Sequence, residues 1–299
     1  MSHVLTLIAG APAQPLDAAC IAQARAVLPA PGETKWLSEG EACDITFTLV
    51  ELSEITTIRD RVREALKGAA IDVVCQQRQS RRKRLLIADM DSTLIGQECI
   101  DEIADYVGLR PKISEITERA MRGELEFEPA LRERVALLKG VDEKALQTLF
   151  DEQITLNPGA RTLARTMSAH GARSVIVSGG FTYFTARVAE ISGFDAHQAN
   201  TLEIEGGKLT GRVIEPILGQ QAKLDALRHY RKIMELDHID SLCVGDGAND
   251  LAMLSEAGLG VAYHAKPMVA AKAHARVNHG DLTALLFAQG YARDEFVED

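Results

Sequence analysis

Two groups of aspartates stand directly after apolar runs of the sequence. Residues 89–93 read Asp-Met-Asp-Ser-Thr and follow the apolar residues 85–88. Residues 245–250 read Gly-Asp-Gly-Ala-Asn-Asp and follow the apolar residues 242–244. Asp often ends a strand because it favours turns, but two carboxylates two residues apart repel each other unless a cation or a shared proton lies between them. The pattern therefore predicts a site that holds a cation.

Asp89 and Asp246 offer the kind of ligand that a hard divalent cation prefers. Mg²⁺ is usually bound by one or two carboxylates, with phosphate oxygens and waters completing its shell. Gly245 and Gly247 could also cradle the pyrophosphate of a dinucleotide, but the carboxylates beside them would repel it unless a metal lay between. We therefore predict a magnesium site here.

Two weaker signals accompany the aspartates. Residues 177–181 read Val-Ser-Gly-Gly-Phe and lead from a strand-like run towards a helix. The hydroxyl of Ser178 and the free N–H groups at such a helix start suit a phosphate group. Lys223 lies in a helical stretch, where a lone lysine is ordinarily a solvated charge. Each feature gains meaning only in combination with the aspartates.

The apolar runs that carry these residues are typical of a parallel sheet. Such runs occupy residues 85–88, 174–177, 241–244 and 259–262. Continuous apolar strands separated by helices indicate a doubly wound α/β sheet that is covered on both faces. Ligands of such sheets bind beyond the carboxyl ends of the strands, which is where Asp89, Ser178 and Asp246 would lie.

Residues 95–173 separate the first two runs and look almost wholly helical. This stretch is too long for a single crossover between strands. We therefore expect an inserted helical cap at about residues 96–170, above the edge of the sheet. A β-hairpin is predicted over residues 200–213, around Gly206 and Gly207.

Residues 1–77 predict a second, smaller α+β domain. Strand-like runs and helical stretches follow the order β-α-β-β-α-β, which is the ferredoxin-like arrangement. This order resembles the ACT-type regulatory domain, which implies a regulatory role. Residues 78–84 form the only dense basic run, and we interpret it as a solvated linker rather than a nucleic-acid or targeting patch. Residues 85–299 would then form the catalytic domain.

The composition agrees with a two-domain protein without nucleic-acid or membrane partners. The chain has 299 residues and a net charge of -10, so it lacks the basic character of nucleic-acid binders. No apolar run approaches the roughly 18 residues that span a bilayer, and the first residues lack the basic start of a secretory signal. Five cysteines without a Cys-x-x-Cys pair predict free thiols in a reducing compartment. We therefore expect a cytoplasmic protein.

Taken together and in this order, the motifs resemble the haloacid dehalogenase superfamily of aspartyl-phosphate phosphohydrolases. Residues 89–98, 177–181 and 245–253 are similar to the signatures of those members that hydrolyse O-phospho-L-serine. The resemblance covers about residues 85–290. It implies a Mg²⁺-dependent phosphatase with O-phosphoserine as its substrate, at the last step of L-serine biosynthesis, and it is compatible with a homodimer.

The resemblance also implies catalytic roles. Asp89 would attack phosphorus, and Asp91 would protonate the departing oxygen and then accept a proton from water. The metal would be bound by Asp89, by Asp246 and by the main-chain carbonyl of Asp91. Lys223 and Ser178 would cancel charge on the phosphoryl group, since a carboxylate attacks an anion only where charge is offset. The anions around Asp91 should raise its pKa and keep it protonated.

Further roles follow from the same resemblance. Glu98 would bind the ammonium group of the substrate and Arg134 its carboxylate, because a planar guanidinium matches a carboxylate in a bidentate way. The remaining expected members of the site are Gly179 and Asn249 at the phosphoryl oxygens, Met121 and Phe127 as apolar cover, and Asp250 and Thr93 as supports.

Two alternatives stay open. The same chemical core could belong to a phosphatase or phosphotransferase that acts on another small phosphometabolite. The chain could also be an amino-acid-sensing regulatory binding protein whose second domain is inert. The intact set of Asp89, Lys223 and Asp246 argues against an inert domain.

Overall fold

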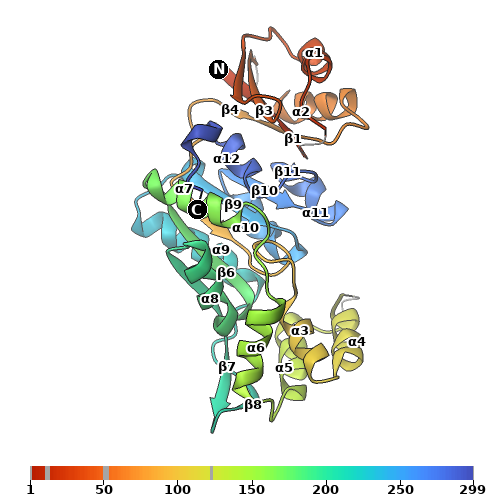
Figure 1. Cartoon of the computed structure of the whole chain (residues 1–299), viewed down its shortest axis with the longest axis vertical. Coiled ribbons are helices and arrows are strands. Elements are labelled where there is room, and N and C mark those ends of the chain that lie inside the picture. The colour runs from red at the N-terminus through yellow and green to blue at the C-terminus, as the bar shows by residue number, and fades with distance from the viewer. Residues whose placement is uncertain (1, 11–13, 50–53, 122–123, 299) are drawn as a thin grey trace.

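A computed structural model describes residues 2–10, 14–49, 54–121 and 124–298 (Figure 1). The described residues form a four-stranded sheet of order β2-β3-β1-β4 and a seven-stranded sheet of order β11-β10-β9-β5-β6-β7-β8. Figure 1 shows the smaller sheet at the top of the molecule, beside the C-terminal elements drawn in blue. A group of helices drawn in yellow and green lies at the opposite end.

The smaller sheet belongs to the ferredoxin-like unit that the sequence predicts. Its elements are β1 (Ser2–Ala9), α1 (Ala18–Val27), β2 (Thr34–Ser38), β3 (Ala42–Thr48), α2 (Glu54–Ala65) and β4 (Ile71–Gln77). The three strand pairs are antiparallel. Helix α1 begins where the Asp17 carboxylate accepts a hydrogen bond from the backbone N–H of Cys20 at 2.8 Å, a typical N-cap. The expected β-α-β-β-α-β order is confirmed.

The larger sheet confirms the predicted doubly wound fold. Its strands are β5 (Leu85–Ala88), β6 (Arg173–Phe181), β7 (Ala196–Glu205), β8 (Lys208–Ile214), β9 (Ser241–Gly245), β10 (Leu259–Tyr263) and β11 (Ala275–Val277). All neighbours pair in parallel except β7 with β8. Alternate residues of β5 enter two different cores, with Leu86 on one face and Leu85 and Ile87 on the other. This two-sided burial explains why the strand is apolar throughout.

Helices cover both faces of this sheet. They are α7 (Ala160–Ala169), α8 (Thr182–Ser192), α9 (Gln220–Ile233), α10 (Leu251–Glu256), α11 (Pro267–Lys272) and α12 (Ala284–Ala288). Helix α7 packs against α8, α12 and β6. The expected cap extended to residue 170, but these contacts make α7 a part of the layer that covers the sheet.

The cap itself consists of four helices. They are α3 (Cys99–Tyr106), α4 (Arg110–Met121), α5 (Phe127–Leu137) and α6 (Glu143–Gln153). Helix α3 packs against α4 and α6, and α5 packs against strand β8. The hairpin of β7 and β8 is confirmed, with Gly206 and Gly207 at positive φ in its turn. Strand β8 of this hairpin therefore packs against helix α5 of the cap.

One buried carboxylate contributes directly to the contact between the two units. Asp72 on β4 is 2% exposed. Its carboxylate accepts hydrogen bonds at 2.8, 3.2 and 2.8 Å from three successive backbone N–H groups, those of Asn278, His279 and Gly280. These three N–H groups follow β11 in the larger unit. We refer to this arrangement as the Asp72 junction.

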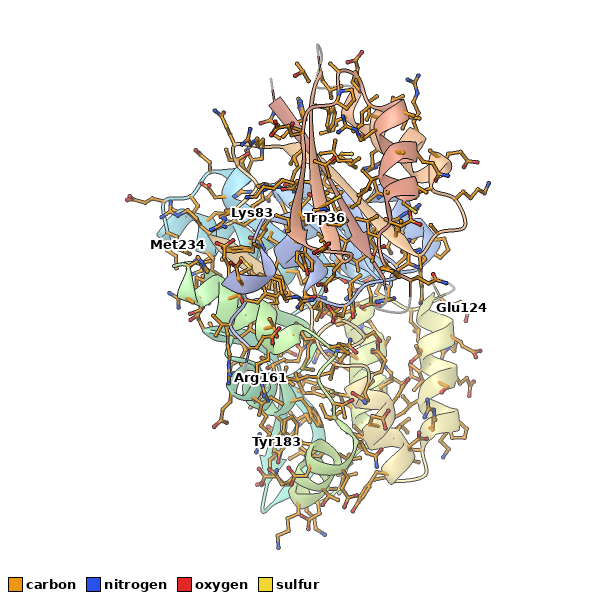
Figure 2. The ribbon with its side chains drawn as sticks, turned by 45° about the horizontal axis from the view of Figure 1, so that its top comes forward. Trp36, Lys83, Glu124, Arg161, Tyr183 and Met234 are labelled. Atoms are coloured by element: carbon orange, nitrogen blue, oxygen red, sulfur yellow. The ribbon has the colours of Figure 1, made fainter. Side chains whose placement is uncertain are left out.

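The basic run 78–84 is solvated only in part, because Arg78, Arg82 and Arg84 are exposed whereas Arg81 and Lys83 are not. Arg81 contacts the Asp44 carboxylate at 2.6 Å. Lys83, labelled in Figure 2, is 5% exposed, and its Nζ donates to the main-chain carbonyl of Ile239 at 2.7 Å. These side chains contact both units because the segment runs through the junction between them.

Two expectations from composition can be compared with the structure. All five cysteines are free thiols, as predicted. Four of them are buried. None of the helices in the described ranges is long and apolar enough to cross a membrane.

Candidate active site

The carboxyl ends of three adjacent strands bring the predicted residues together. Strand β5 lies between β6 and β9, so the segments around Asp89, Ser178 and Asp246 meet at one edge of the sheet. The backbone N–H of Asp89 donates to the carbonyl of Val244 at 3.0 Å. Carboxylate oxygens of Asp89, Asp246 and Asp250 all lie within 4.8 Å of one another. The two aspartate motifs therefore form one cluster.

Lys223 lies buried between two of these carboxylates. It stands in the first turn of α9 and is 2% exposed. Its Nζ lies 2.6 Å from Oδ2 of Asp89 and 2.6 Å from Oδ1 of Asp250. Burial lowers the pKa of Lys223, but attraction to Asp89 and Asp250 outweighs burial and raises the pKa above its usual value. Lys223 is therefore a fixed positive charge between Asp89 and Asp250.

Asp250 is held from two sides. It is completely buried, and in addition to Lys223 it accepts the N–H of Gly247 at 3.0 Å. Burial, followed by the charge of Asp89, raises the pKa of Asp250 to about 7. A Cβ atom at Gly245 would lie 2.3 Å from this carboxylate. The glycine thus allows Asp250 to pack against the strand end, which gives the Gly-Asp-Gly motif a structural reason.

Asp91 lies in a buried and anionic environment. Its Oδ1 atom has no hydrogen-bond partner among the residues that the structure describes. Burial raises the pKa of Asp91 well above its usual range, and the charges of Glu98 and Asp89 raise it further. The expected direction of the shift is confirmed. A carboxyl that keeps its proton in this way can act as a general acid.

Thr93 positions Asp246, and Asn157 in turn positions Thr93. The Thr93 hydroxyl donates to Oδ1 of Asp246 at 3.1 Å. The Thr93 carbonyl accepts a hydrogen bond from Nδ2 of Asn157 at 2.8 Å. Burial and the charge of Asp89 raise the pKa of Asp246. The sequence analysis missed Asn157, and only its place before Pro158 in a loop sets it apart.

The cluster carries more negative charge than its own cations balance. Its carboxylates are those of Asp89, Asp91, Glu98, Asp246 and Asp250. Across the described ranges, Lys223 is the cation that forms ion pairs with this group. The donors are oxygen atoms, the ligand type that a hard divalent cation prefers. The residues present therefore fit a metal ion.

Ser178 and the glycines after it lie at the carboxyl end of β6, where the pairing register with β7 shifts. Ser178 is 3% exposed, and its Oγ accepts the N–H of Gly180 at 2.9 Å. A Cβ atom at Gly180 would lie 2.9 Å from Oδ2 of Asp91, so a larger residue would disturb the general-acid candidate. Asn249 lies exposed in the short 3₁₀ helix Ala248–Asp250 at the next strand end.

The cap reaches the sheet edge through Phe127. This residue begins α5 and is 36% exposed. A Cβ atom at Gly179 or at Gly219 would lie 3.2 Å from its ring, so the ring covers both glycines. Met121 ends α4, but its side chain lies outside the described part of the chain. The predicted apolar cover is thus seen for Phe127.

Glu98 stands where the catalytic loop enters the cap. Its Oε1 accepts the hydroxyl hydrogen of Ser92 at 2.7 Å, and the residue remains accessible at the mouth of the site. Desolvation of its carboxylate by the surrounding protein atoms raises the pKa of Glu98, and the charges of Asp246 and Asp89 add to this effect. Ser92 has a φ of 54°, an uncommon conformation for serine. The sequence analysis gave Ser92 no role.

Arg134 approaches the same mouth from α5. Its Nε donates to the carbonyl of Ala130 at 3.2 Å and its Nη1 to the Thr117 hydroxyl at 3.4 Å. Burial lowers the pKa of Arg134, while the charges of Asp101 and Glu98 act in the opposite direction. Arg134 thus lies close enough to Glu98 for their charges to interact.

Comparison with known proteins places these features in a family context. The sequence model of the haloacid dehalogenase-like hydrolases matches residues 86–255. A phosphoserine phosphatase of Streptomyces coelicolor is 44% identical over 254 residues, which cover 85% of this chain and 62% of that protein. The crystal structure of a probable phosphoserine phosphatase from Vibrio cholerae superposes with a TM-score of 0.79 at 34% identity, covering 98% of this chain and 88% of the other.

A structure described as a phospho-aspartyl intermediate analogue of phosphoserine phosphatase is also similar. It is 38% identical with a TM-score of 0.64, and the match covers 69% of this chain and 98% of the other. The chain spans 60 to 64% of the length of the first curated relatives that it matches.

Proposed function

Because the chain belongs to the haloacid dehalogenase-like hydrolase family, we propose that it hydrolyses O-phospho-L-serine to L-serine and phosphate through an aspartyl-phosphate. The observation that carries this proposal is the buried Asp89 carboxylate, 2.6 Å from Lys223 and beside a carboxyl whose pKa is raised. The names of the relatives support this substrate. The reaction would be the last step of L-serine biosynthesis.

In the first step, a carboxylate oxygen of Asp89 would attack phosphorus and form the aspartyl-phosphate. Lys223 would offset the charge of the phosphoryl oxygens, and the Ser178 hydroxyl would donate a hydrogen bond to them, with Gly179 and Asn249 as further contacts. These groups lie in place before the substrate arrives, so they need little reorganisation during reaction. Asp250 would keep Lys223 in position.

Asp91 would transfer the protons. It would protonate the seryl oxygen as the bond to phosphorus breaks, and the ionised Asp91 would then take a proton from the water that attacks the aspartyl-phosphate. Its buried position beside Glu98 and Asp89 supports this role, since a general acid must hold its proton until the bond breaks.

Mg²⁺ is the metal that we propose for this site. It would be held by Asp89, by Asp246 and by the main-chain carbonyl of Asp91, with Thr93 positioning Asp246. When bound, the metal would supply positive charge opposite the phosphoryl oxygens.

Removal of the metal should stop the reaction reversibly. A chelator is expected to lower kcat at least about a hundredfold, because metal ions contribute several kcal/mol to such steps. Added Mg²⁺ should restore the rate, whereas Ca²⁺, which takes more ligands at longer distances, should not. The measurement is phosphate release during dialysis against chelator and re-addition of each ion. Full activity in the presence of chelator would contradict the metal assignment.

Arg134 and Glu98 would recognise the two charges of the serine moiety. We propose that Arg134 pairs with the substrate carboxylate and Glu98 with its ammonium group, while Met121 and Phe127 cover the site. An arginine fork matches a carboxylate in two hydrogen bonds.

Arg134→Ala should therefore lower kcat/KM for phosphoserine more than kcat/KM for an aryl phosphate. Loss of one partner of a desolvated charge pair costs about 2–5 kcal/mol, so kcat/KM for phosphoserine should fall about 30-fold to several thousandfold. An aryl phosphate has no α-carboxylate, and its kcat/KM should change less than about tenfold. Steady-state kinetics with both substrates provide the test.

Arg132→Ala is the matched control for this experiment. Arg132 lies on the same helix, but its half-exposed side chain contacts Glu215 at 2.5 Å instead. Both substrates should react with this variant at rates close to the wild type. If Arg134→Ala lowered kcat/KM equally for both substrates, Arg134 would have only a structural role.

The alternative is a phosphatase or phosphotransferase for another small phosphometabolite. A panel of phosphomonoesters, measured with and without an added acceptor alcohol, separates the two. Phosphoserine should have the highest kcat/KM, and the phosphoryl group should pass to water. A higher value for another ester would replace the substrate assignment but leave the chemistry of Asp89 intact.

We extend the proposal to compartment, regulation and assembly. Five free thiols fit a reducing compartment, which we propose to be the cytoplasm. Residues 1–77 would have a regulatory role, and the working assembly would be a homodimer, which light scattering can test.

A further inference from the structure

A second cavity lies where the two units meet, apart from the carboxylate cluster. Its volume is about 170 Å³. One wall comes from the end of α2 and the start of β4, and the other from β11 and the residues after it, since β4 packs against β11. The polar residues that line it are Arg63, Lys67, Asp72, Arg276, Asn278 and His279.

Two guanidinium groups, one from each unit, line this cavity. Arg63 lies on α2 with its side chain 14% exposed, and Arg276 lies on β11. Burial, together with the positive charges of Arg276 and Arg59, lowers the pKa of Arg63 to about 10. Like charges are thus held close together at a largely buried place. Their repulsion costs free energy unless an anion lies between them.

The acceptors near the cavity balance this charge only in part. Glu64 pairs with Lys67 at 3.2 Å, and Nη2 of Arg63 donates to the carbonyl of Val73 at 3.4 Å. Both oxygens of Asp72 are occupied by three backbone N–H groups in the Asp72 junction. Asp60 is 58% exposed, and its Oδ1 is shared between Arg59 at 3.2 Å and Arg63 at 3.4 Å. Arg276 forms no ion pair within the ranges that the structure describes. The cavity therefore has an excess of positive charge.

We propose that this cavity binds a small oxyanion of phosphate geometry between Arg63 and Arg276. Guanidinium forks donate paired N–H groups to phosphate oxygens. The volume is several times the roughly 30 Å³ that one water occupies, so a phosphate fits with a few waters. The anion would bind here whichever ester the active site hydrolyses.

Such an anion would couple the two units. Because one arginine comes from each, the site exists only while the units are docked. A ligand that binds only the folded arrangement stabilises it by an amount that grows with the logarithm of the ligand concentration once this concentration exceeds the dissociation constant. Phosphate should therefore raise the resistance of the whole chain to unfolding.

Thermal unfolding of the full chain tests this inference. Inorganic phosphate is titrated against sodium chloride of equal ionic strength, and the midpoint should rise by about 2–4 °C near saturation. Arg63→Gln and Arg276→Gln should each remove most of this increment. Arg228→Gln is the matched control, because Arg228 is an exposed arginine of α9 outside the cavity. Phosphate binding at the active site contributes equally to all variants and cancels in the comparison.

Two further arms sharpen the result. Arg276→Lys keeps the charge but loses the fork, so it should fold normally and still lose most of the increment. Glycerol phosphate, added to Asp89→Asn so that it is not hydrolysed, distinguishes the source of the anion. An equal increment supports the phosphoryl group of an ester as ligand, and no increment supports free phosphate. If the glutamine variants and Arg276→Lys all kept the full increment, the site would not exist.

Discussion

Asp89→Asn is expected to lower kcat for phosphoserine by about 10⁴-fold or more, the scale seen when a covalent nucleophile is removed. An amide is a far weaker nucleophile towards phosphorus and carries no charge for a metal. The fold should be retained, because Lys223 keeps its second partner, Asp250, at 2.6 Å. The variant therefore separates chemistry from structure.

The measurement is a rapid acid quench with ³²P-labelled phosphoserine. The wild-type protein should become labelled in a rapid burst, and hydroxylamine should release this label, as expected for an acyl phosphate. Asp89→Asn should show no such labelling. Asp225→Asn is the control, since Asp225 is an exposed aspartate of α9 whose hydrogen-bond partner among the described residues is Gln221, at 2.8 Å. Turnover of Asp89→Asn within tenfold of the wild type would remove Asp89 from the nucleophile role.

Lys223→Met should abolish turnover and also destabilise the protein. The substitution removes the charge that offsets the phosphoryl oxygens, so kcat should fall at least about a thousandfold, as for other electrostatic contacts to a transition state. It also leaves the buried carboxylates of Asp89 and Asp250 without their cation. Breaking a buried ion pair in this way costs about 3–5 kcal/mol. Denaturant unfolding and steady-state kinetics measure the two losses.

A double substitution distinguishes the two contributions of Lys223. Adding Asp250→Asn to Lys223→Met removes one of the stranded carboxylates, so stability should recover in part while turnover stays absent. Lys232→Met, at an exposed position of the same helix, should change neither property. Recovery of turnover in the double variant would mean that Lys223 acts only through structure.

The residues at the strand ends could be predicted because their signal is local. A continuous apolar run followed by Asp89 or Asp246 indicates a buried parallel strand with a carboxylate beyond it, and the structure places these groups within 4.8 Å of each other. The ferredoxin-like unit was predictable for a similar reason, since its elements alternate within 77 residues.

The contacts that hold these groups in place could not be predicted. Asn157 reaches the main-chain carbonyl of Thr93 across 64 residues of sequence, and a bond to a carbonyl requires no particular partner side chain. The partial burial of the basic run could not be predicted, because charge alone does not reveal burial. Lys83 is buried since carbonyl groups accept its hydrogen bonds, and the sequence does not show which carbonyls will be near.

The extent of the cap shows a similar limit. Residues 96–170 look almost wholly helical in the sequence, and the helical pattern is the same whether a helix covers the sheet or stands above it. Helix α7 belongs to the helical layer that covers the sheet, because it packs against β6. Only tertiary contacts separate these two possibilities.

The Asp72 junction makes the smaller unit a part of one cooperative folding unit. Excision of residues 1–77 would remove the acceptor of the N–H groups of Asn278, His279 and Gly280. It would also expose to water the apolar side chains that share a core with Ile8, Leu37 and Val74, at a cost of about 25 cal/mol per Å². Those N–H groups follow β11, at the edge of the sheet that carries the catalytic aspartates. The two sheets are separate in topology, yet heat or denaturant should melt them in a single transition. Shortening the chain to residues 85–299 would therefore lower its stability even where every proposed catalytic residue is kept.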